Sequence, residues 1–420
     1  MHYLFLQGGY SSFFNRVADG LVARGHLVTG INFCAGDQWL WRDKDTINYR
    51  GRLRDWPAFI AQYFEQHAIT DVVLLGEQRD YHKQAVEAAQ RRGIRVLVTD
   101  FGYLRPDWLT LERDGMGGNS HFPKDPQALL EYGKGMPSVD RQARYSDRLR
   151  DMAFGDLVYS FANVLLWFLF PHYRRSDHRA HPLRYFPSIG WRLLFSRRRN
   201  RQAEETFAQL QGGGKAYFLF PMQLDHDFQI QAYSPFCSVD EAIRLVMSSF
   251  CEHAPADNYL LFKVHPWDPG FKNWRRRIVA WARDSGVEGR VVFVDGGSLA
   301  EMLRHAKGMV TVNSTSAVQA FQVGCPVACL GQAIFNMPGL THQDALASFW
   351  TEPPKPNREL VDAFERLLAG SIQFRGVFYS EPGLTAAVEE AVKRLDAPQR
   401  YASPWAGSEV AGENQHPMNS

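Results

Sequence analysis

Short apolar runs that alternate with amphipathic segments are the feature that most constrains the fold of this chain. Buried strands of about five residues separated by helices are typical of a parallel sheet with helices on both faces. Four such runs lie between Asn258 and Gly339, at Tyr259–Val264, Val291–Val294, Met309–Val312 and Pro326–Leu330. Ligands of such sheets bind at the carboxyl ends of the strands.

Polar residues follow two of these runs, where a ligand of the sheet would bind. They are Lys263, His265 and Pro266 after the first run, and Asn313, Ser314, Thr315 and Ser316 after the third. A Ser/Thr cluster at the start of the expected helix 317–323 caps free backbone N–H groups and forms an anion site with the helix dipole. The alternative is an ordinary loop histidine and a plain helix cap. Together the two clusters favour a nucleotide-type ligand.

The first half of the chain has the same rhythm of strands and helices. We expect strands at 3–6, 26–32, 71–75 and 95–99 and helices at 13–24, 53–67 and 82–92. Gly8 and Gly9 form a tight turn after the first strand, where a ligand could approach the backbone and where we expect acceptor contacts. They do not complete a dinucleotide-binding fingerprint.

Asp100 ends the fourth expected strand and Arg105 follows within one turn. A carboxylate at a strand's carboxyl end, close to an arginine, is suited to catalysis in a cleft between domains. The alternative is an Asp that begins a turn, with Arg105 as its ion-pair partner.

The alternation of strands and helices is interrupted between residues 105 and 211. In this region an apolar run at Leu157–Phe170 precedes a cluster of arginines. They are Arg174, Arg175, Arg179, Arg184, Arg192, Arg197, Arg198, Arg199 and Arg201. The run is shorter than the roughly 20 residues that cross a bilayer. Either it forms a helix on an anionic membrane surface, or a core helix crosses between domains beside solvated arginines.

The second half opens with a strand at 216–220, followed by Gln223, Asp225 and Asp227. The Asp-His-Asp spacing is a weak metal motif, and we expect no metal site. The glycines at 212–214 suggest a domain boundary. The expected division is therefore an N-terminal Rossmann-like domain at 1–110, a helical arginine-rich region at 111–211, a nucleotide-binding Rossmann-like domain at 212–395 and a disordered tail at 396–420.

Composition excludes several classes of protein. The 420 residues are enough for two α/β domains, and a net charge of +2 predicts no general affinity for nucleic acid. The five cysteines are widely spaced and form no CxxC pair, which favours a reducing compartment over a disulfide framework. The N-terminus lacks a secretory signal and is expected to be a strand.

Eight motifs in family order resemble the bacterial capsule polysaccharide biosynthesis and export family of the KpsS (or LipB) type, whose members resemble β-Kdo transferases. They are LFLQGGYSSFF from Leu4, Gly36-Asp37, LLGEQRDYHKQA, GYLRP at 102–106, QLDHDFQI at 223–230, KVHP, VTVNSTSAVQA and GLTHQ at 339–343.

The resemblance implies an α/β fold of the GT-B type, with two Rossmann-like domains and a central cleft. It implies a retaining transferase that moves β-Kdo from CMP-β-Kdo to a phosphatidylglycerol-type lipid, starting the capsule linker at the cytoplasmic face of the inner membrane. A KpsC-type transferase and the capsule export complex are implied partners, and CMP-Kdo is a substrate rather than a cofactor.

Carried onto this chain, the resemblance places His265 and Pro266 at the CMP phosphate, with Ser314 and Thr315 as further contacts. Asp100 and Asp227 are the expected catalytic carboxylates. The family's acidic motif has two carboxylates before glycine, whereas this chain has Phe101 in the second place. The alternatives are a GT-B enzyme or epimerase acting on a UDP-sugar, and a non-catalytic component of capsule assembly.

Overall fold

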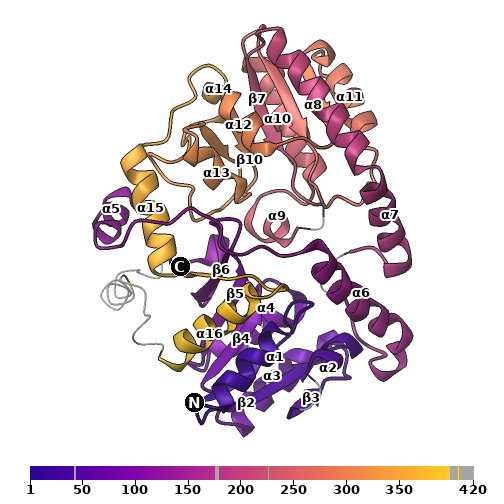
Figure 1. Cartoon of the computed structure of the whole chain (residues 1–420), viewed down its shortest axis with the longest axis vertical. Helices are drawn as coiled ribbons and strands as arrows, with labels where there is room; N and C mark the ends of the chain where they lie inside the picture. Colours follow the sequence, from indigo (N-terminus) through magenta and orange to yellow (C-terminus); the bar gives the residue numbers. More distant parts are fainter. Residues whose placement is uncertain (42–43, 176–178, 226, 398–404, 406–420) are drawn as a thin grey trace, which may run out of the picture. The chain divides into compact units, whose positions relative to one another are not determined.

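The computed structural model describes residues 1–41, 44–175, 179–225, 227–397 and 405, and its described residues form two compact α/β units. Unit 1 takes its residues from 1–123, 128–176 and 363–420, and unit 2 from 124–127 and 177–362. Figure 1 shows helices lying against the sheet of each unit. The expected α/β class with two Rossmann-like domains is confirmed by the two sheets described below.

Unit 1 contains a seven-stranded sheet in the order β12-β6-β5-β4-β1-β2-β3. Its strands are β1 (His2–Phe5), β2 (Leu27–Asn32), β3 (Thr46–Asn48), β4 (Asp71–Leu75), β5 (Arg95–Phe101), β6 (Trp108–Arg113) and β12 (Gln373–Arg375). The strands from β5 to β3 are parallel, whereas β6 pairs antiparallel with both β5 and β12. The four strands expected from the sequence correspond to β1, β2, β4 and β5 and pair in parallel, whereas β3, β6 and β12 were not predicted.

The helices of unit 1 are α1 (Phe13–Val22), α2 (Ala35–Leu40), α3 (Trp56–Gln66), α4 (Asp80–Gln90), α6 (Leu149–Leu165) and α16 (Gly383–Asp396), with 3-10 turns η1 (Leu53–Asp55), η2 (Gly117–Asn119) and η3 (Trp167–Leu169). α1 and α16 share one apolar core with the sheet, in which Phe13 packs edge-on against Phe378 at 5.1 Å. Gly20 lets them approach, because a Cβ there would lie 2.6 Å from the side chain of Val392.

Unit 2 contains a five-stranded parallel sheet in the order β11-β10-β7-β8-β9. Its strands are β7 (Tyr217–Pro221), β8 (Tyr259–Lys263), β9 (Val291–Val294), β10 (Gly308–Thr311) and β11 (Val327–Cys329). Its helices are α7 (Pro182–Leu194), α8 (Ser196–Gly212), α9 (Phe228–Tyr233), α10 (Val239–His253), α11 (Trp274–Asp284), α12 (Leu299–His305), α13 (Ser316–Gln322) and α14 (Leu346–Phe349), with the 3-10 turn η4 (Glu288–Arg290).

The division of the chain differs from the one expected from the sequence. β12 pairs with β6, so residues near 373 belong to the first sheet rather than to the C-terminal domain. The glycines at 212–214 lie at the end of α8 inside unit 2 and mark no boundary between the units. α5 (Pro126–Lys134) and α15 (Arg358–Gly370) have residues in both units. The expected disordered tail at 396–420 lies outside the described residues except for three positions. Asp396 ends α16 and Ala397 caps it, so the expectation is wrong at these two residues, and Trp405 packs against Phe122 at 5.4 Å.

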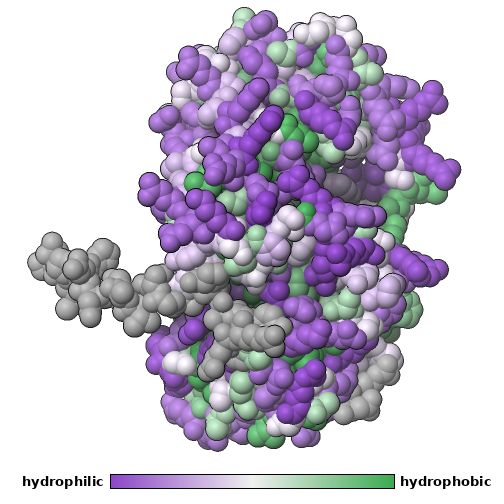
Figure 2. All heavy atoms as spheres, turned by 60° about the vertical axis from the view of Figure 1, so that its left-hand side comes forward, coloured by the Kyte–Doolittle hydropathy of each residue, from purple (hydrophilic) through white to green (hydrophobic). Residues whose placement is uncertain are grey.

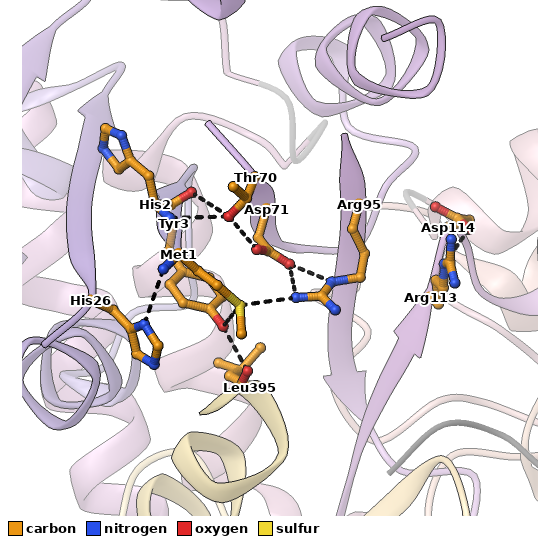
Figure 3. A network of polar contacts seen from close by, with 10 residues as sticks. All are labelled: Met1, His2, Tyr3, His26, Thr70, Asp71, Arg95, Arg113, Asp114 and Leu395. Carbon is orange, nitrogen blue, oxygen red and sulfur yellow. Dashed lines mark hydrogen bonds and ion pairs between the residues drawn. The ribbon is translucent and has the colours of Figure 1, made fainter. Parts of the chain in front are cut away.

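A polar network ties the amino ends of the strands in unit 1 to α16 (Figure 3). The hydroxyl of Tyr3 donates to the backbone oxygen of Leu395 at 2.6 Å, and Thr70 Oγ1 donates to Asp71 Oδ2 at 2.6 Å. Asp71 is buried and pairs with Arg95 of the neighbouring strand. Because this network lies at the amino ends of β4 and β5, it stabilises the sheet at the edge opposite to the expected site.

The apolar run at Leu157–Phe170 forms the second half of α6 and the turn η3. Of the helix only Tyr159 and Ser160 are buried, and most of its other residues are partly exposed. Whether this helix lies on a membrane surface or crosses between domains stays a prediction. Within the described residues, the structure contains no helix with the length and apolar character needed to span a bilayer. Figure 2 shows exposed hydrophobic residues in green among the purple hydrophilic ones.

Candidate active site

The carboxyl ends of β10, β7 and β8 are neighbours at one edge of the sheet in unit 2. β7 lies between the other two strands, and all three run parallel. The polar segments that follow these strands are Gln223–Asp227 after β7, His265–Pro266 after β8 and Asn313–Ser316 after β10. The structure therefore brings the three polar segments expected from the sequence to one edge, where ligands of parallel sheets bind.

Gln223 and Asn313 connect two of these segments through buried hydrogen bonds. Gln223 Nε2 donates to Asn313 Oδ1 at 2.9 Å, and the backbone N–H of Asn313 donates to Gln223 Oε1 at 3.2 Å. Asn313 Nδ2 donates to the backbone oxygen of Gln229 in α9 at 2.7 Å. Because buried amide groups that are fully paired hold one arrangement, the loops after β7 and β10 are fixed relative to each other.

Asp227 joins the same network at the start of α9. Its Oδ1 accepts the backbone N–H of Gln229 at 2.9 Å, and its Oδ2 accepts a longer hydrogen bond from Gln223 Nε2 at 3.4 Å. Hydrogen bonds from neutral donors favour the charged form of a carboxyl group. Asp225, two residues earlier, instead pairs with Lys272 at 2.8 Å. The two acidic residues of the Asp-His-Asp segment thus have separate partners.

The Ser/Thr cluster begins α13 with a different cap from the one expected. Thr315 occupies the capping position but makes no side-chain capping bond. Ser314 Oγ instead accepts the backbone N–H of Ser316 at 3.3 Å and its hydroxyl at 3.0 Å. Ser314 is therefore the residue that caps this short helix, and anion binding by the cluster stays a prediction.

His265 and Lys263 follow each other at the end of β8. The Nδ1 of His265 accepts the backbone N–H of Trp267 at 3.1 Å. A neutral imidazole that accepts at Nδ1 carries its proton on Nε2, so this ring is a hydrogen-bond donor at Nε2. Lys263 is buried, and burial lowers the pKa of its ammonium while Asp295 opposes the shift. Pro266 is exposed and begins the loop that follows the strand.

Asp100 lies inside β5 in unit 1, one residue before the strand ends. Its Oδ1 accepts the backbone N–H of Phe101 at 2.7 Å. Burial raises the pKa of this carboxyl group. The hydrogen bond from Phe101 and the positive charges of Arg79 and Arg105 lower it, but burial has the larger effect. The guanidinium of Arg105 stacks on the Phe101 ring at 5.2 Å, so it acts on Asp100 at longer range and not as the ion-pair partner considered from the sequence.

Gly8 and Gly9 follow β1, as expected. At residue 8, close packing against Phe14 explains why the chain has glycine. A Cβ on Gly8 would lie 2.7 Å from the ring of Phe14, whereas a Cβ on Gly9 would be 3.6 Å from Leu75, an ordinary contact. A side chain at residue 8 would displace Phe14 from the core of unit 1. The acceptor contacts expected for both glycines stay a prediction.

A buried polar cluster at the carboxyl ends of β1 and β2 was not expected from the sequence. Gln7 Nε2 donates to both oxygens of Asp37 at 3.2 Å, and the hydroxyl of Tyr159 donates to Asp37 Oδ1 at 2.8 Å. The Sγ of Cys34 lies 3.0 Å from the same hydroxyl. Burial raises the pKa of Asp37. Since Tyr159 belongs to α6, the cluster holds this helix on unit 1.

Comparison with known proteins identifies the family. The profile of the family described as "Capsule polysaccharide biosynthesis protein" matches residues 70–379. The "Capsule polysaccharide modification protein LipB" of Neisseria meningitidis serogroup A is 33% identical over 395 residues, which cover 90% of this chain and 91% of LipB. The "Capsule polysaccharide export protein KpsS" of Escherichia coli is 29% identical over 384 residues, covering 90% and 96%.

A solved structure is also similar. The β-Kdo 2,7 transferase of Thermosulfurimonas dismutans KpsC aligns with a TM-score of 0.45 and 15% identity, and the alignment covers 94% of this chain and 99% of that one. The profile match and the two curated relatives confirm the resemblance inferred from the motifs. The chain belongs to the capsule polysaccharide biosynthesis protein family and acts in capsule polysaccharide biosynthesis or modification.

Proposed function

We propose that the protein is a retaining glycosyltransferase that moves β-Kdo from CMP-β-Kdo to a phosphatidylglycerol-type lipid, which starts the capsule linker. Membership in the capsule family supports the pathway. The observation that carries the activity is the polar edge of unit 2, where the Gln223–Asn313 hydrogen bonds hold two loops next to the strand that leads to His265. This edge offers neutral donors to a leaving phosphate.

The donor phosphate takes up negative charge as CMP leaves. His265 Nε2–H is the donor proposed for a phosphate oxygen, since Nδ1 is occupied by the Trp267 N–H. Ser314 and Thr315 follow the adjacent strand β10 and are proposed as further phosphate or cytidine contacts. Donors that are fixed before the reaction stabilise developing charge without a cost of reorganisation. CMP carries one phosphate, so the proposal includes no metal and no cofactor.

Two carboxylates are proposed to serve the sugar, and their surroundings suit them to different roles. Asp227 accepts two hydrogen bonds, which stabilise its anion, and it is assigned to stand against the oxocarbenium-like centre as nucleophile. Burial raises the pKa of Asp100, which makes it a stronger base than an ordinary carboxylate and suits it to take the proton of the acceptor hydroxyl.

The acceptor is proposed to be a lipid at a membrane surface, where the protein binds peripherally. In unit 1 the end of α6 and the turn η3 expose apolar side chains, namely Leu165 at 70%, Trp167 at 64% and Phe168 at 58%. In unit 2 α7 exposes Leu183, Trp191 and Leu194. Arginines follow both segments in the sequence, and basic residues beside exposed aromatic side chains favour an anionic lipid surface.

A donor screen tests this proposal. The protein is incubated with phosphatidylglycerol vesicles and, separately, CMP-β-Kdo, UDP-N-acetylglucosamine or UDP-glucose, and the released nucleotide is measured. Release of CMP that requires both the lipid and Asp100 supports the proposal. Release of UDP, or turnover of a UDP-sugar without an acceptor, would instead support a UDP-sugar transferase or an epimerase.

A further inference from the structure

Unit 2 contains a cavity of about 380 Å³ beside the carboxyl ends of β8 and β9. α8 and the first residues of α11 form its other walls. The charged residues that line it are Arg192, Arg199, Asp268, Lys272, Arg275 and Asp295. None of the residues assigned above to the donor or to the sugar lines it.

Most of these charges already have a partner. The ammonium of Lys272 pairs with Asp225 at 2.8 Å and with Asp240 at 2.5 Å. The carboxylate of Asp268 accepts the Gly270 N–H at 2.7 Å and the indole N–H of Trp274 at 2.9 Å. Arg192 on α7 and Arg199 on α8 both have Asp295 as their acidic partner.

Asp295 serves two guanidinium groups at once. Its Oδ1 lies 2.8 Å from Arg192 Nη2, and its Oδ2 lies 3.9 Å from Arg199 Nη1. The same carboxylate acts on the buried ammonium of Lys263. Apart from Asp268, which accepts hydrogen bonds from neutral donors, one carboxylate therefore faces the buried Lys263 and two partly buried arginines. Positive charge that is withdrawn from water without full compensation is unfavourable.

The hydrogen-bonding capacity of the two arginines is also unfilled. The Nε of Arg192 and the Nε of Arg199 are both buried and have no acceptor among the described residues. Burial lowers the pKa of Arg199, Asp295 opposes this shift and Arg192 adds to it. Buried donors without an acceptor are rare in native proteins and call for an explanation.

The surrounding backbone is shaped around these side chains. Ser188 Oγ donates to the backbone oxygen of Pro269 at 2.5 Å and ties α7 to the loop after β8. Gly270 has a φ of +75°, and a Cβ there would lie 3.2 Å from the guanidinium of Arg192. Asn200 Oδ1 accepts the N–H of Gly297 at 3.2 Å and ties α8 to the loop after β9. The arginines thus belong to a built pocket rather than to a mobile surface.

We propose that this cavity binds a phosphate monoester through Arg192 and Arg199. A phosphate monoester carries nearly two negative charges at neutral pH, so it balances two guanidinium groups where Asp295 alone balances one. Guanidinium forks match the geometry of phosphate oxygens. The ester has two possible sources, a nucleoside monophosphate and a glycerol phosphate. The inference is independent of the transferase assignment.

Isothermal titration calorimetry on the full chain tests the inference, with inorganic phosphate, CMP and glycerol 3-phosphate as separate probes. We expect Arg199→Gln to weaken binding of at least one probe by about tenfold or more, as loss of a charge-assisted hydrogen bond does. Arg201→Gln is the matched control, because Arg201 lies on the same helix, is 82% exposed and pairs with Glu205. It should leave binding within about twofold of wild type.

Asp295→Asn separates binding from folding. Without the competing carboxylate, the arginines are released to the ligand and binding should tighten, whereas a purely structural role of the ion pair predicts weaker binding in both variants. Tighter binding by Asp295→Asn together with weaker binding by Arg199→Gln supports the inference, and the probe affected identifies the source of the phosphate. Absence of binding by all three probes, or weaker binding by Asp295→Asn, overturns it. A protein that fails to turn over CMP-β-Kdo would leave these binding results unchanged.

Discussion

Gln223 and Asn313 exchange two hydrogen bonds although 90 residues separate them in the chain. Each residue follows a strand, and the two strands are neighbours in the sheet of unit 2. The pair thereby links the loop that contains Asp227 to the loop that begins α13. We infer that the shape of the donor site depends on this link.

Gln223→Ala should therefore weaken donor binding more than it weakens the fold. It removes the donor to Asn313 and to Asp227, and it leaves buried polar groups unpaired, which costs about 1–3 kcal/mol. We expect the Kd for CMP to rise about tenfold, measured by calorimetry. Gln66→Ala, at the exposed end of α3, is the control. An unchanged Kd in Gln223→Ala would show that the link does not shape the site.

Stability of unit 1 should fall as the pH rises from about 5 to about 8. Burial raises the pKa of Glu112 from an ordinary 4.5 to about 8, although hydrogen bonds from Ser120 and Tyr103 act to lower it. Between these values the folded protein keeps a proton that the unfolded chain releases, so the free energy of unfolding decreases with pH across this window.

Glu112→Gln removes this titration. The difference in unfolding free energy between pH 5 and pH 8 should shrink by an amount on the order of a few kcal/mol, measured by urea denaturation. Glu65→Gln is the control, because Glu65 is 65% exposed. The assignment is wrong if Glu112→Gln and wild type lose stability equally over this window.

The strands and helices that the sequence predicted well are those with short, clearly bounded apolar runs. Asp71–Leu75 and Val291–Val294 coincide with β4 and β9, because each run is short, continuous and followed by polar or glycine residues. β12 was missed because it has three residues and its partner lies far away in the chain, with Gln373 opposite Thr110. Because β12 was not predicted, the residues around it were assigned to the C-terminal domain instead of to the first sheet.

The sequence predicted the residues of the candidate site that directly follow strands, but not the contacts between segments that are distant in the chain. Residues that follow strands, such as His265 and Asn313, could be placed at one sheet edge from the pattern alone. The contact between Tyr159 and Asp37 could not, since it joins a helix in the arginine-rich region to α2, 122 residues away. The polar side chain of Tyr159 inside an apolar run was the available signal.

Gly155→Ala should destabilise unit 1 by loosening α6. A Cβ at residue 155 would clash with the backbone oxygen of Tyr10. We expect the free energy of unfolding to fall by about 1–3 kcal/mol, measured by chemical denaturation. Gly190→Ala in α7 is the matched control, because its Cβ would meet no atom within 4 Å. It should be neutral or stabilising by up to about 1 kcal/mol. Equal effects of the two substitutions would contradict this packing.

Trp167→Ser together with Phe168→Ser should reduce binding to phosphatidylglycerol vesicles. Both side chains are exposed in η3, and insertion of one such aromatic side chain contributes roughly 1.5–3 kcal/mol. We expect the partition coefficient to fall at least about tenfold in a sedimentation assay. Trp39→Ser is the control, because Trp39 is 48% exposed on α2. If the double variant partitions like wild type, this segment is not the membrane contact.

The lipid product after incubation with CMP-β-Kdo and phosphatidylglycerol tests the central claim most directly, by mass spectrometry. We predict that wild type yields phosphatidylglycerol with one added Kdo residue, and that Asp100→Asn yields at least about 100-fold less while remaining folded. Asp55→Asn, at an exposed position, should form product at the wild-type rate. Unmodified lipid after incubation with wild type, or equal product from wild type and Asp100→Asn, would contradict the account.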